Sequence, residues 1–294
     1  MKLPDMFGGT ATDPEALGRC IVLKDGAMAT ALFARGLDPA ERATDWNLSR
    51  PLEVRTVHDG FLEAGCDYLQ TNTFNWPGAD LKAVQAGAAI ARAAVEDHGA
   101  GQVAGNLGPA PVGASSGYIA ERTTAVVEAL VAGGVGWISL ETLVDPEAAR
   151  VQLDAALAAS DLCVTASFTL GADENETRVF AGASIVEMAQ QLEAAGAGAL
   201  GINCSAGGAQ LLRALPELRE ATRLPLIAAP NAGTPRIERG AVMLEKWVWD
   251  PSPQAFAANL VALVQGGAQV VGGCCGAGSE HLAAARAALN GLAN

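Results

Sequence analysis

The sequence is poor in aromatic residues, in histidine and in positive charge. Aromatic residues make up 5% of the 294 residues, there are three histidines, and the formal net charge is −13 with a pI near 4.6. An acidic surface gains nothing from a polyanion, which argues against nucleic acids and anionic membranes as partners. Half of the residues are hydrophobic, and that is enough to fill one large core or two smaller ones.

The chain also lacks long apolar runs and a disulfide framework. No run is long enough to cross a bilayer, and the first residues have no apolar stretch of the kind that forms a signal peptide. Six cysteines in a chain of this length do not make a disulfide scaffold. We therefore expect a cytoplasmic protein in a reducing compartment, with free thiols that are core residues or metal ligands.

Strand-like apolar runs recur at regular intervals, and each is followed by a helical pattern. Continuous apolar strands that alternate with helices predict a parallel sheet covered on its outside. Eight such units in this length predict an α/β fold, the (β/α)8 TIM barrel. The eight runs are Ile21–Lys24, Tyr68–Thr71, Gln102–Gly105, Trp137–Leu140, Val164–Phe168, Ala199–Ile202, Pro225–Ala228 and Gln269–Gly272.

Eight segments have apolar residues near the helical period, and three of them begin with a proline, which the first turn of a helix tolerates. A doubly wound open sheet is the competing fold, but no G-x-G-x-x-G motif follows the first strand. We see no linker, so we expect one domain over residues 1–294. The predicted helices are Pro51–Glu63, Ala79–Glu96, Ala120–Ala132, Pro146–Ala158, Ser184–Ala194, Ala209–Glu220, Pro253–Val264 and Glu280–Leu292.

The predicted barrel divides the six cysteines into two groups. Cys20, Cys66 and Cys163 each precede a strand, at the end of a barrel that serves stability, so we expect them to be small buried hydrophobes. The other three follow strands, at the end where barrel enzymes build their sites. Two segments after strands, 32–50 and 231–250, are longer than connections require and are expected to contribute to the same end.

Cys204, Cys274 and Cys275 are therefore the candidates for chemistry. Three thiolates around one mouth would bind zinc and leave its fourth position open, which is the catalytic rather than the structural pattern. Adjacent cysteines on a regular strand point to opposite faces, but the glycines around them allow the chain to turn. Buried packing of these thiols and a strained disulfide between neighbours remain alternatives.

Several strings in the chain resemble the homocysteine S-methyltransferase family, and the resemblance runs from about Lys24 to His281. The strings are Asp25-Gly26-Ala27-Met28-Ala29-Thr30, Asp45-Trp46-Asn47-Leu48, Val57-His58, Ala64-Gly65-Cys66-Asp67, Gln70-Thr71-Asn72-Thr73-Phe74, Glu141-Thr142, Gly201-Ile202-Asn203-Cys204, Pro230-Asn231-Ala232-Gly233 and Gly272-Gly273-Cys274-Cys275-Gly276. The chain departs from the family at Ala29, where glycine is usual, and after Gly276, where the family often continues Thr-Thr-Pro.

The resemblance implies a barrel fold and assigns roles to individual residues. It makes Cys204, Cys274 and Cys275 the zinc ligands. It also implies that Asp25 and Glu141 hold the ammonium group of homocysteine.

The backbone amides of Gly26, Ala27 and Met28 would then receive the carboxylate of homocysteine. Apart from the resemblance, Asn72 and Asn231 follow strands and are candidates for substrate contacts. No protein side chain beyond the zinc site is expected to act as a catalytic group.

The expected reaction is zinc-dependent transfer of a methyl group from a small onium donor to homocysteine, giving methionine. S-methylmethionine is the favoured donor, since cobalamin- and folate-binding modules are absent from the sequence. A cationic donor would be held by aromatic faces, and we expect one or two of five aromatic residues to line its pocket: Trp46, Phe74, Trp76, Trp247 and Trp249.

Three other functions stay open on the sequence alone. A betaine-type donor or a corrinoid partner could supply the methyl group. A barrel that binds zinc or senses redox state without catalysis would keep the three thiolates. The partners are thus homocysteine and a small methyl donor, with neither nucleic acid nor membrane, and the chain could form a homo-oligomer.

Overall fold

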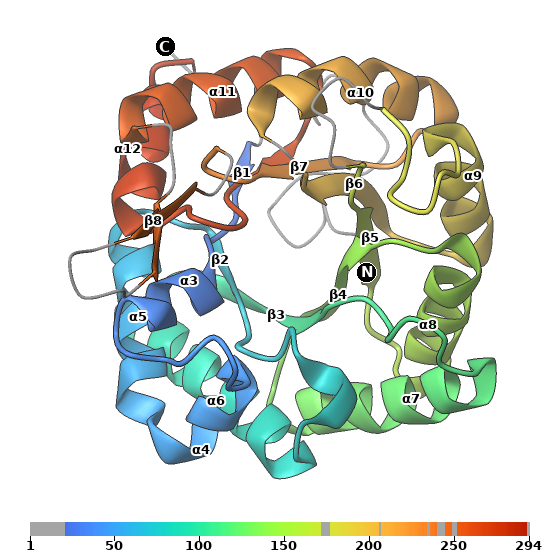
Figure 1. Cartoon of the computed structure of the whole chain (residues 1–294), viewed down its shortest axis with the longest axis horizontal. Coiled ribbons are helices and arrows are strands. Elements are labelled where there is room, and N and C mark those ends of the chain that lie inside the picture. The colour runs from blue at the N-terminus through green and yellow to red at the C-terminus, as the bar shows by residue number, and fades with distance from the viewer. Residues whose placement is uncertain are drawn as a thin grey trace.

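The computed structural model describes residues 21–171, 177–205, 207–233, 236–239, 245–248 and 252–292. Within these residues, eight parallel strands follow one another in the order β1-β10-β7-β6-β5-β4-β3-β2. A parallel bridge between Lys24 and Tyr68 joins the first strand to the second and brings the sheet round to a nearly closed barrel. The predicted (β/α)8 barrel is confirmed, and Figure 1 shows its strands inside a ring of helices.

The barrel strands are short and sit at the positions that the apolar runs predict. They are β1 (Val22–Leu23), β2 (Tyr68–Gln70), β3 (Gln102–Leu107), β4 (Trp137–Leu143), β5 (Val164–Phe168), β6 (Ala199–Cys204), β7 (Leu226–Pro230) and β10 (Val270–Val271). The second of the two long segments contains an antiparallel hairpin, β8 (Arg236–Arg239) with β9 (Glu245–Val248).

The eight outer helices are α5 (Pro51–Glu63), α6 (Leu81–His98), α7 (Ser116–Ala132), α8 (Pro146–Ala159), α9 (Ile185–Ala195), α10 (Gly208–Ala221), α11 (Pro253–Gln265) and α12 (Ser279–Asn290). Shorter pieces follow the first two strands: α3 (Met28–Phe33), η1 (Ala43–Asp45), α4 (Trp46–Ser49) and η2 (Trp76–Gly78). No helix in the described residues is long and apolar enough to cross a membrane.

Side-chain caps explain five of the eight outer helix starts. The side chains of Asp80, Ser115, Asp145, Ser184 and Ser252 accept a hydrogen bond from the first turn of the helix that follows. The cap at Ser115 starts α7 four residues before the predicted Ala120, because the apolar period alone does not register a polar first turn.

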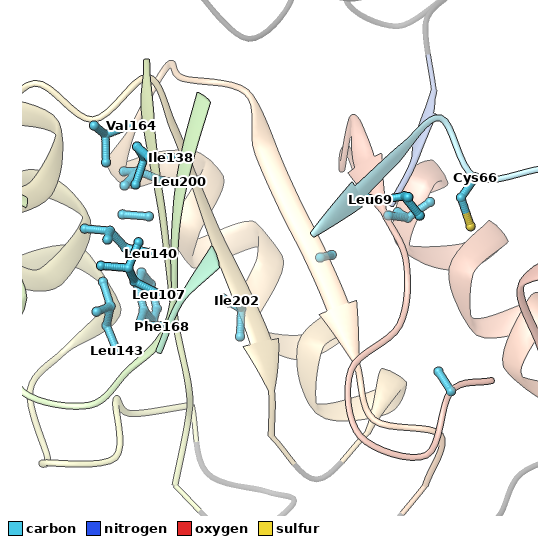
Figure 2. Close-up of a cluster of buried hydrophobic side chains, with 14 of the residues drawn as sticks. Cys66, Leu69, Leu107, Ile138, Leu140, Leu143, Val164, Phe168, Leu200 and Ile202 are labelled. Atoms are coloured by element: carbon cyan, nitrogen blue, oxygen red, sulfur yellow. The ribbon is translucent and has the colours of Figure 1, made fainter. Parts of the chain in front are cut away.

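The core has two parts, one on each face of the curved sheet. The larger part lies between the strands and the helices, and Figure 2 labels Leu69, Ile138, Val164 and Leu200 among its side chains. The smaller part gathers one residue from each of seven strands: Val22, Tyr68, Ala104, Trp137, Ala199, Ile227 and Val270. Side chains alternate along a strand, so this second cluster fills the lower barrel interior.

The interior changes character two residues further along the strands. The residues that follow the apolar layer on the same face include Lys24, Gln70, Asn106 and Ser139, and all four are buried. An apolar floor and a polar layer above it therefore place a buried polar site at the carboxyl ends of the strands, where barrel enzymes carry their chemistry.

The cysteines that precede strands were predicted to be buried packing residues, and the structure describes two of the three. Cys66 lies in the larger core with 6% of its surface exposed, as expected for a buried thiol. Cys163 is half-buried beside the lower interior cluster. Cys20 lies outside the described residues.

Candidate active site

Three thiols meet at the mouth of the barrel. The Sγ atoms of Cys204, Cys274 and Cys275 all lie within 4.8 Å of one another, and each residue is half-buried. Cys204 ends β6 and the other two follow β10, with β7 between these strands in the sheet. The predicted convergence of these strand ends is therefore confirmed.

The backbone turns sharply at each thiol. Cys204 and Ser205 both have a φ of 60°, a left-handed conformation that residues with a side chain seldom adopt. Asn231 stabilises it twice: its side-chain Nδ2 donates to the Ser205 carbonyl at 2.6 Å, and its backbone amide donates to the Cys204 carbonyl at 3.3 Å. The left-handed Gly276, at φ 80°, turns the chain after Cys275.

Hydrogen bonds within the cluster separate the three pKa values. Donation from Cys274 and Cys275 lowers the pKa of Cys204 to about 3. Hydrogen bonding to Cys204 raises the pKa of Cys274 to about 12, and the pKa of Cys275 rises as well. The three thiols therefore do not ionise independently, and Cys204 is the one whose ionised form the other two stabilise.

The donor set suits a zinc ion. Zinc binds thiolate sulfur at about 2.3 Å in a tetrahedron, which places sulfurs roughly 3.8 Å apart. The spacing of the three sulfurs, within 4.8 Å, needs little adjustment to reach that geometry. Three protein sulfurs leave one corner of the tetrahedron for a ligand from the adjoining cavity, so the residues present fit a catalytic rather than a structural zinc site.

A cavity of about 150 Å³ opens directly beside the thiols, and its wall includes all three of them. Asp25 lines it with 1% of its surface exposed. Its Oδ2 accepts from the amide of Gln70 at 2.7 Å, whereas Oδ1 has no hydrogen-bond partner within the described residues. Burial raises the pKa of Asp25 to about 7, although the nearby Lys24 opposes that rise.

Glu141 faces the same cavity from β4. Its Oε1 accepts from Nδ2 of Asn106 at 2.7 Å, and its Oε2 lies 3.5 Å from Nδ2 of Asn203. Burial raises the pKa of this carboxyl also. Asp25 and Glu141 are thus brought together on one wall, as the sequence predicted, and both present acceptor oxygens to the cavity.

Asn203 connects the acidic wall to the thiols. Its Oδ1 accepts from the hydroxyl of Ser167 at 2.9 Å and from the amide of Thr142 at 2.8 Å. Its Nδ2 lies 3.9 Å from Sγ of Cys274. Thr142 itself has a φ of 59°, so the residue after Glu141 is held in a strained conformation by this side chain.

The expected receptors of a substrate carboxylate lie where β1 passes into α3. Gly26, Ala27 and Met28 all line the cavity. The amide of Ala27 donates to the carbonyl of Ala277 at 3.0 Å, while Met28 begins the first turn of α3. A side chain at position 26 would overlap that same Ala277 carbonyl, which explains the glycine.

The two asparagines chosen from the sequence have different positions. Asn72 lines the cavity, but its Nδ2 donates to the carbonyl of Ala43 at 2.7 Å and to Oδ1 of Asn47 at 3.0 Å. It therefore anchors the segment before α4 as well as facing the cavity. Asn231 lies behind Cys204, where it stabilises the strained turn, and is not among the residues of the cavity wall.

Of the five aromatic candidates, Phe74 lines the cavity and has 36% of its surface exposed. Trp46 and Trp76 are buried instead; the indole of Trp76 donates to the carbonyl of Gly108 at 2.8 Å. The side chain of Trp247 and the whole of Trp249 lie outside the described residues. The cavity therefore offers one described aromatic face.

Sequence reasoning missed Lys24 and Asn106. The Nζ atom of Lys24 lies 3.8 Å from Oε2 of Glu141 and 4.0 Å from Oδ1 of Asp25. Asn106 orients Glu141 and leaves its own Oδ1 without a partner in the described part of the chain. Strand alternation could have found both, because each follows a lower-interior residue by two positions.

A family model described as homocysteine S-methyltransferase matches residues 22–289 of the chain. The methionine synthases of Mycobacterium tuberculosis and Mycobacterium leprae are each 28% identical to it over 94% of its length. The chain spans about a quarter (25%) of the length of these curated relatives.

Solved structures give a second comparison. The metallated form of the homocysteine methyltransferase MmuM from Escherichia coli superposes with a TM-score of 0.73 at 25% identity, covering 94% of this chain and 99% of that one. The apo form gives a TM-score of 0.72 at 27% identity, covering 91% and 95%. The carboxyl transferase domain of Rhizobium etli pyruvate carboxylase, at 17% identity and a TM-score of 0.56 over 92% of this chain and 43% of that one, shares the fold alone.

Proposed function

The chain belongs to the homocysteine S-methyltransferase family and is a methyltransferase, and from that premise we propose that it transfers a methyl group from a small onium donor to the thiol of homocysteine. The observation that carries the proposal is that three thiols and two carboxyl groups line the same cavity. Homocysteine needs both features, because its sulfur must be activated while its ammonium group is held.

The cofactor that this reaction needs is Zn²⁺, which Cys204, Cys274 and Cys275 would hold. A free thiol has a pKa near ~8.5, so only a few per cent is ionised at neutral pH. When bound, the metal supplies Lewis-acid stabilisation that keeps the substrate sulfur deprotonated. The protein residues set the position of that sulfur, because all three ligands come from strand ends fixed by the barrel.

The acidic wall holds the amino end of the acceptor. Asp25 offers Oδ1, a buried acceptor atom without a partner in the described chain, and an ammonium group is the donor that satisfies it best. Glu141 adds a second carboxylate from β4. The backbone amides of Gly26 and Met28 are proposed to receive the carboxylate, because the amide of Ala27 between them already donates to the carbonyl of Ala277. Asn72 lines the same cavity, and Asn231 acts through the Cys204 turn.

The donor should carry a positive charge, since transfer of its methyl group then discharges it. S-methylmethionine remains our first choice and a betaine-type donor the second. The similarity to MmuM, which extends over 99% of that homocysteine methyltransferase, supports homocysteine as the acceptor. Phe74, half-exposed on the cavity wall, offers the aromatic face that a methyl-bearing cation prefers.

Methionine formation tests this function directly. The purified chain, loaded with zinc, is incubated with homocysteine and with S-methylmethionine, betaine or methylcobalamin in turn, and methionine is measured by mass spectrometry with an isotopically labelled donor methyl. The expected result is label transfer from S-methylmethionine that requires Cys275. Failure to transfer label from any of the three donors would overturn the proposed activity.

The rival function is a barrel that binds zinc or senses redox state without catalysis. Such a protein needs the thiols but has no use for two buried carboxylates beside them. Calorimetric titration with homocysteine separates the two, because the enzyme should bind it and release a proton while the rival should not bind it. That the chain is one domain and that it forms homo-oligomers both stay predictions.

A further inference from the structure

The acidic wall of the cavity already contains a cation. Lys24 projects from the end of β1 into the barrel interior, and its side chain is 4% exposed. Its Nζ atom donates to the carbonyl of Gly273 at 3.1 Å, and this hydrogen bond holds the ammonium group at Gly273, which is next to Cys274 in the chain. From there it faces Glu141 at 3.8 Å and Asp25 at 4.0 Å.

The fold makes room for this lysine. Gly272 lies on the neighbouring chain segment after β10, and a Cβ atom there would overlap the Lys24 side chain. The pKa of Lys24 is raised: burial opposes the charge, but Glu141, Asp25 and more distant thiols outweigh that effect. The raised pKa favours the charged form of this ammonium group, and its hydrogen bond to the Gly273 carbonyl holds it in the wall.

Its distances matter as much as its charge. Both carboxylate oxygens lie beyond ordinary hydrogen-bond length from Nζ, and Oδ1 of Asp25 keeps no partner in the described chain. Lys24 thus acts on the two carboxylates through space and leaves their acceptor atoms open to a ligand. The wall therefore contains two carboxyl groups and one ammonium group before any ligand binds.

Two electrostatic effects follow, and they have the same direction. The Lys24 charge repels a substrate ammonium that approaches Asp25 and Glu141, which weakens the gain from binding it. When the ligand has no ammonium group, the Lys24 charge still partly neutralises the carboxylates of Asp25 and Glu141. The electrostatic cost of burying these two carboxylates without a ligand cation is therefore lower. Each effect reduces the preference of the cavity for a ligand with an α-amino group.

On this basis, which rests on the proposed function, we propose that Lys24 is a specificity-determining residue that lets the site accept thiol acceptors without an α-amino group. The class is the short ω-sulfanyl carboxylic acids, and its nearest member to homocysteine is 4-sulfanylbutanoate. Lys24 acts as a standing counter-ion to Asp25 and Glu141, so the acceptor need not bring its own.

The reaction balances in the same way as with homocysteine. The acceptor thiol loses its proton to solvent, and its sulfur electron pair forms the new bond to the methyl carbon. The bond between that carbon and the sulfonium of the donor breaks, and its electron pair stays on the donor sulfur. The products are 4-(methylsulfanyl)butanoate and a neutral thioether, and nothing is oxidised or reduced.

The first test compares two ligands that differ in the α-amino group alone and carry no thiol. L-methionine and 4-(methylsulfanyl)butanoate are titrated by calorimetry into the full chain at pH 8, where Asp25, with a pKa of about 7, is mostly ionised. Lys24→Met and Lys24→Gln remove the charge, and Lys82→Met, at an exposed position, is the matched control.

In both Lys24 variants the ratio of the two dissociation constants should shift toward methionine by about tenfold or more, the size expected for one charge acting at this range. The Lys82 variant should keep the wild-type ratio. A ratio that does not move in either Lys24 variant overturns the proposal. If neither ligand binds to the wild type, both this inference and the proposed function are overturned.

The second test needs no variant. Wild-type protein is given labelled S-methylmethionine with either homocysteine or 4-sulfanylbutanoate, and both methylated products are expected. Methylation of homocysteine without any detectable methylation of 4-sulfanylbutanoate overturns the role of Lys24 while the proposed function stands. Methylation of neither thiol removes the proposed function, and the ratio of binding constants still decides the role of Lys24.

Discussion

Three residues at the mouth of the barrel have a side chain and a left-handed backbone: Thr142, Cys204 and Ser205. Such conformations cost of order 1–2 kcal/mol each and persist only where neighbours stabilise them. Here the neighbours are Asn203 and Asn231, whose side chains bond the strained segments directly. Strain among the described non-glycine residues is therefore concentrated beside the thiols and Glu141.

Replacing Cys204 or Cys275 by alanine should reduce zinc affinity by about 100-fold or more, because two sulfurs cannot complete the site. Metal content by atomic emission and methionine formation should fall together, while far-ultraviolet circular dichroism stays unchanged. The matched control is Cys66→Ala, which removes a buried thiol of the core away from the mouth. A Cys275→Ala protein with full zinc content would contradict the ligand assignment.

Asp25 should make the stability of the metal-free protein depend on pH. Its folded pKa of about 7 lies above its ordinary value of 3.8. The folded state therefore binds the proton more tightly than the unfolded state. Its contribution to stability is complete below about pH 4 and is lost as the pH rises through about 7, by roughly 2–4 kcal/mol in total.

Urea unfolding at pH 4.5, 6 and 8 should accordingly show a fall in stability that Asp25→Asn flattens. The comparison across pH matters more than the absolute stability of the variant, since asparagine also changes the hydrogen bond to Gln70. Parallel pH profiles for the two proteins would show that Asp25 titrates normally in the fold.

At the scale of elements, the short strand β10 is where packing and chemistry meet. Gly272 follows it, and an added Cβ would overlap the Lys24 side chain and lie 2.7 Å from the Lys24 carbonyl oxygen. Gly272→Ala should lower the free energy of unfolding by about 1–3 kcal/mol. Gly117→Ala, at a helix position with open space, should not destabilise the protein.

A double-mutant cycle then isolates the contact. Adding Lys24→Ala to Gly272→Ala should recover part of the loss, because the side-chain overlap disappears while the overlap with the Lys24 backbone remains. Strictly additive free energies from urea unfolding would mean that Gly272 is required for its backbone alone.

Elements were easier to predict from the sequence than their contacts. The apolar runs located the barrel strands because burial on both faces of a parallel sheet demands such runs. Cys204, Cys274 and Cys275 were found because strand ends of a barrel converge. Lys24 was missed: strand alternation places it on the interior face, two residues after Val22, but does not show which side chains surround it there.

The aromatic residues also show that sequence position does not predict which way a side chain points. Trp46 and Trp76 follow strands and could have faced the cavity as well as Phe74 does, yet both are buried. Their burial is decided by packing against segments remote in sequence, such as the Gly108 carbonyl that receives the Trp76 indole. A position along the chain gives the end of the barrel, but not the direction of a side chain there.

At the scale of the whole molecule, the fold and the metal site should be thermodynamically separable. The described core lies in two apolar clusters, and none of the three thiols belongs to either. Removing zinc with a chelator should leave the barrel folded. Restoring zinc at 100 times its dissociation constant should add about 2.7 kcal/mol, which corresponds to a rise of roughly 4–5 °C in Tm by calorimetry for a chain of 294 residues.

The Cys204→Ala protein is the control for that measurement, because added zinc should leave its Tm unchanged. Loss of the far-ultraviolet signal on chelation would instead mean that the metal is required for folding. Specific binding is the quantity of interest, since an acidic chain with a net charge of −13 also attracts cations weakly over its surface.

The side-chain amide of Asn203 lies between the acidic residues and the thiols of the cavity. Asn203 lies 3.5 Å from a Glu141 oxygen and 3.9 Å from the Cys274 sulfur, so any shift that a guest imposes at one end is felt at the other. Thermodynamic reciprocity then requires that a bound amino acid change the affinity for the ion by the same factor by which the ion changes the affinity for the amino acid. In a cell where metal is scarce, the supply of acceptor would thereby decide how many copies of this chain are loaded.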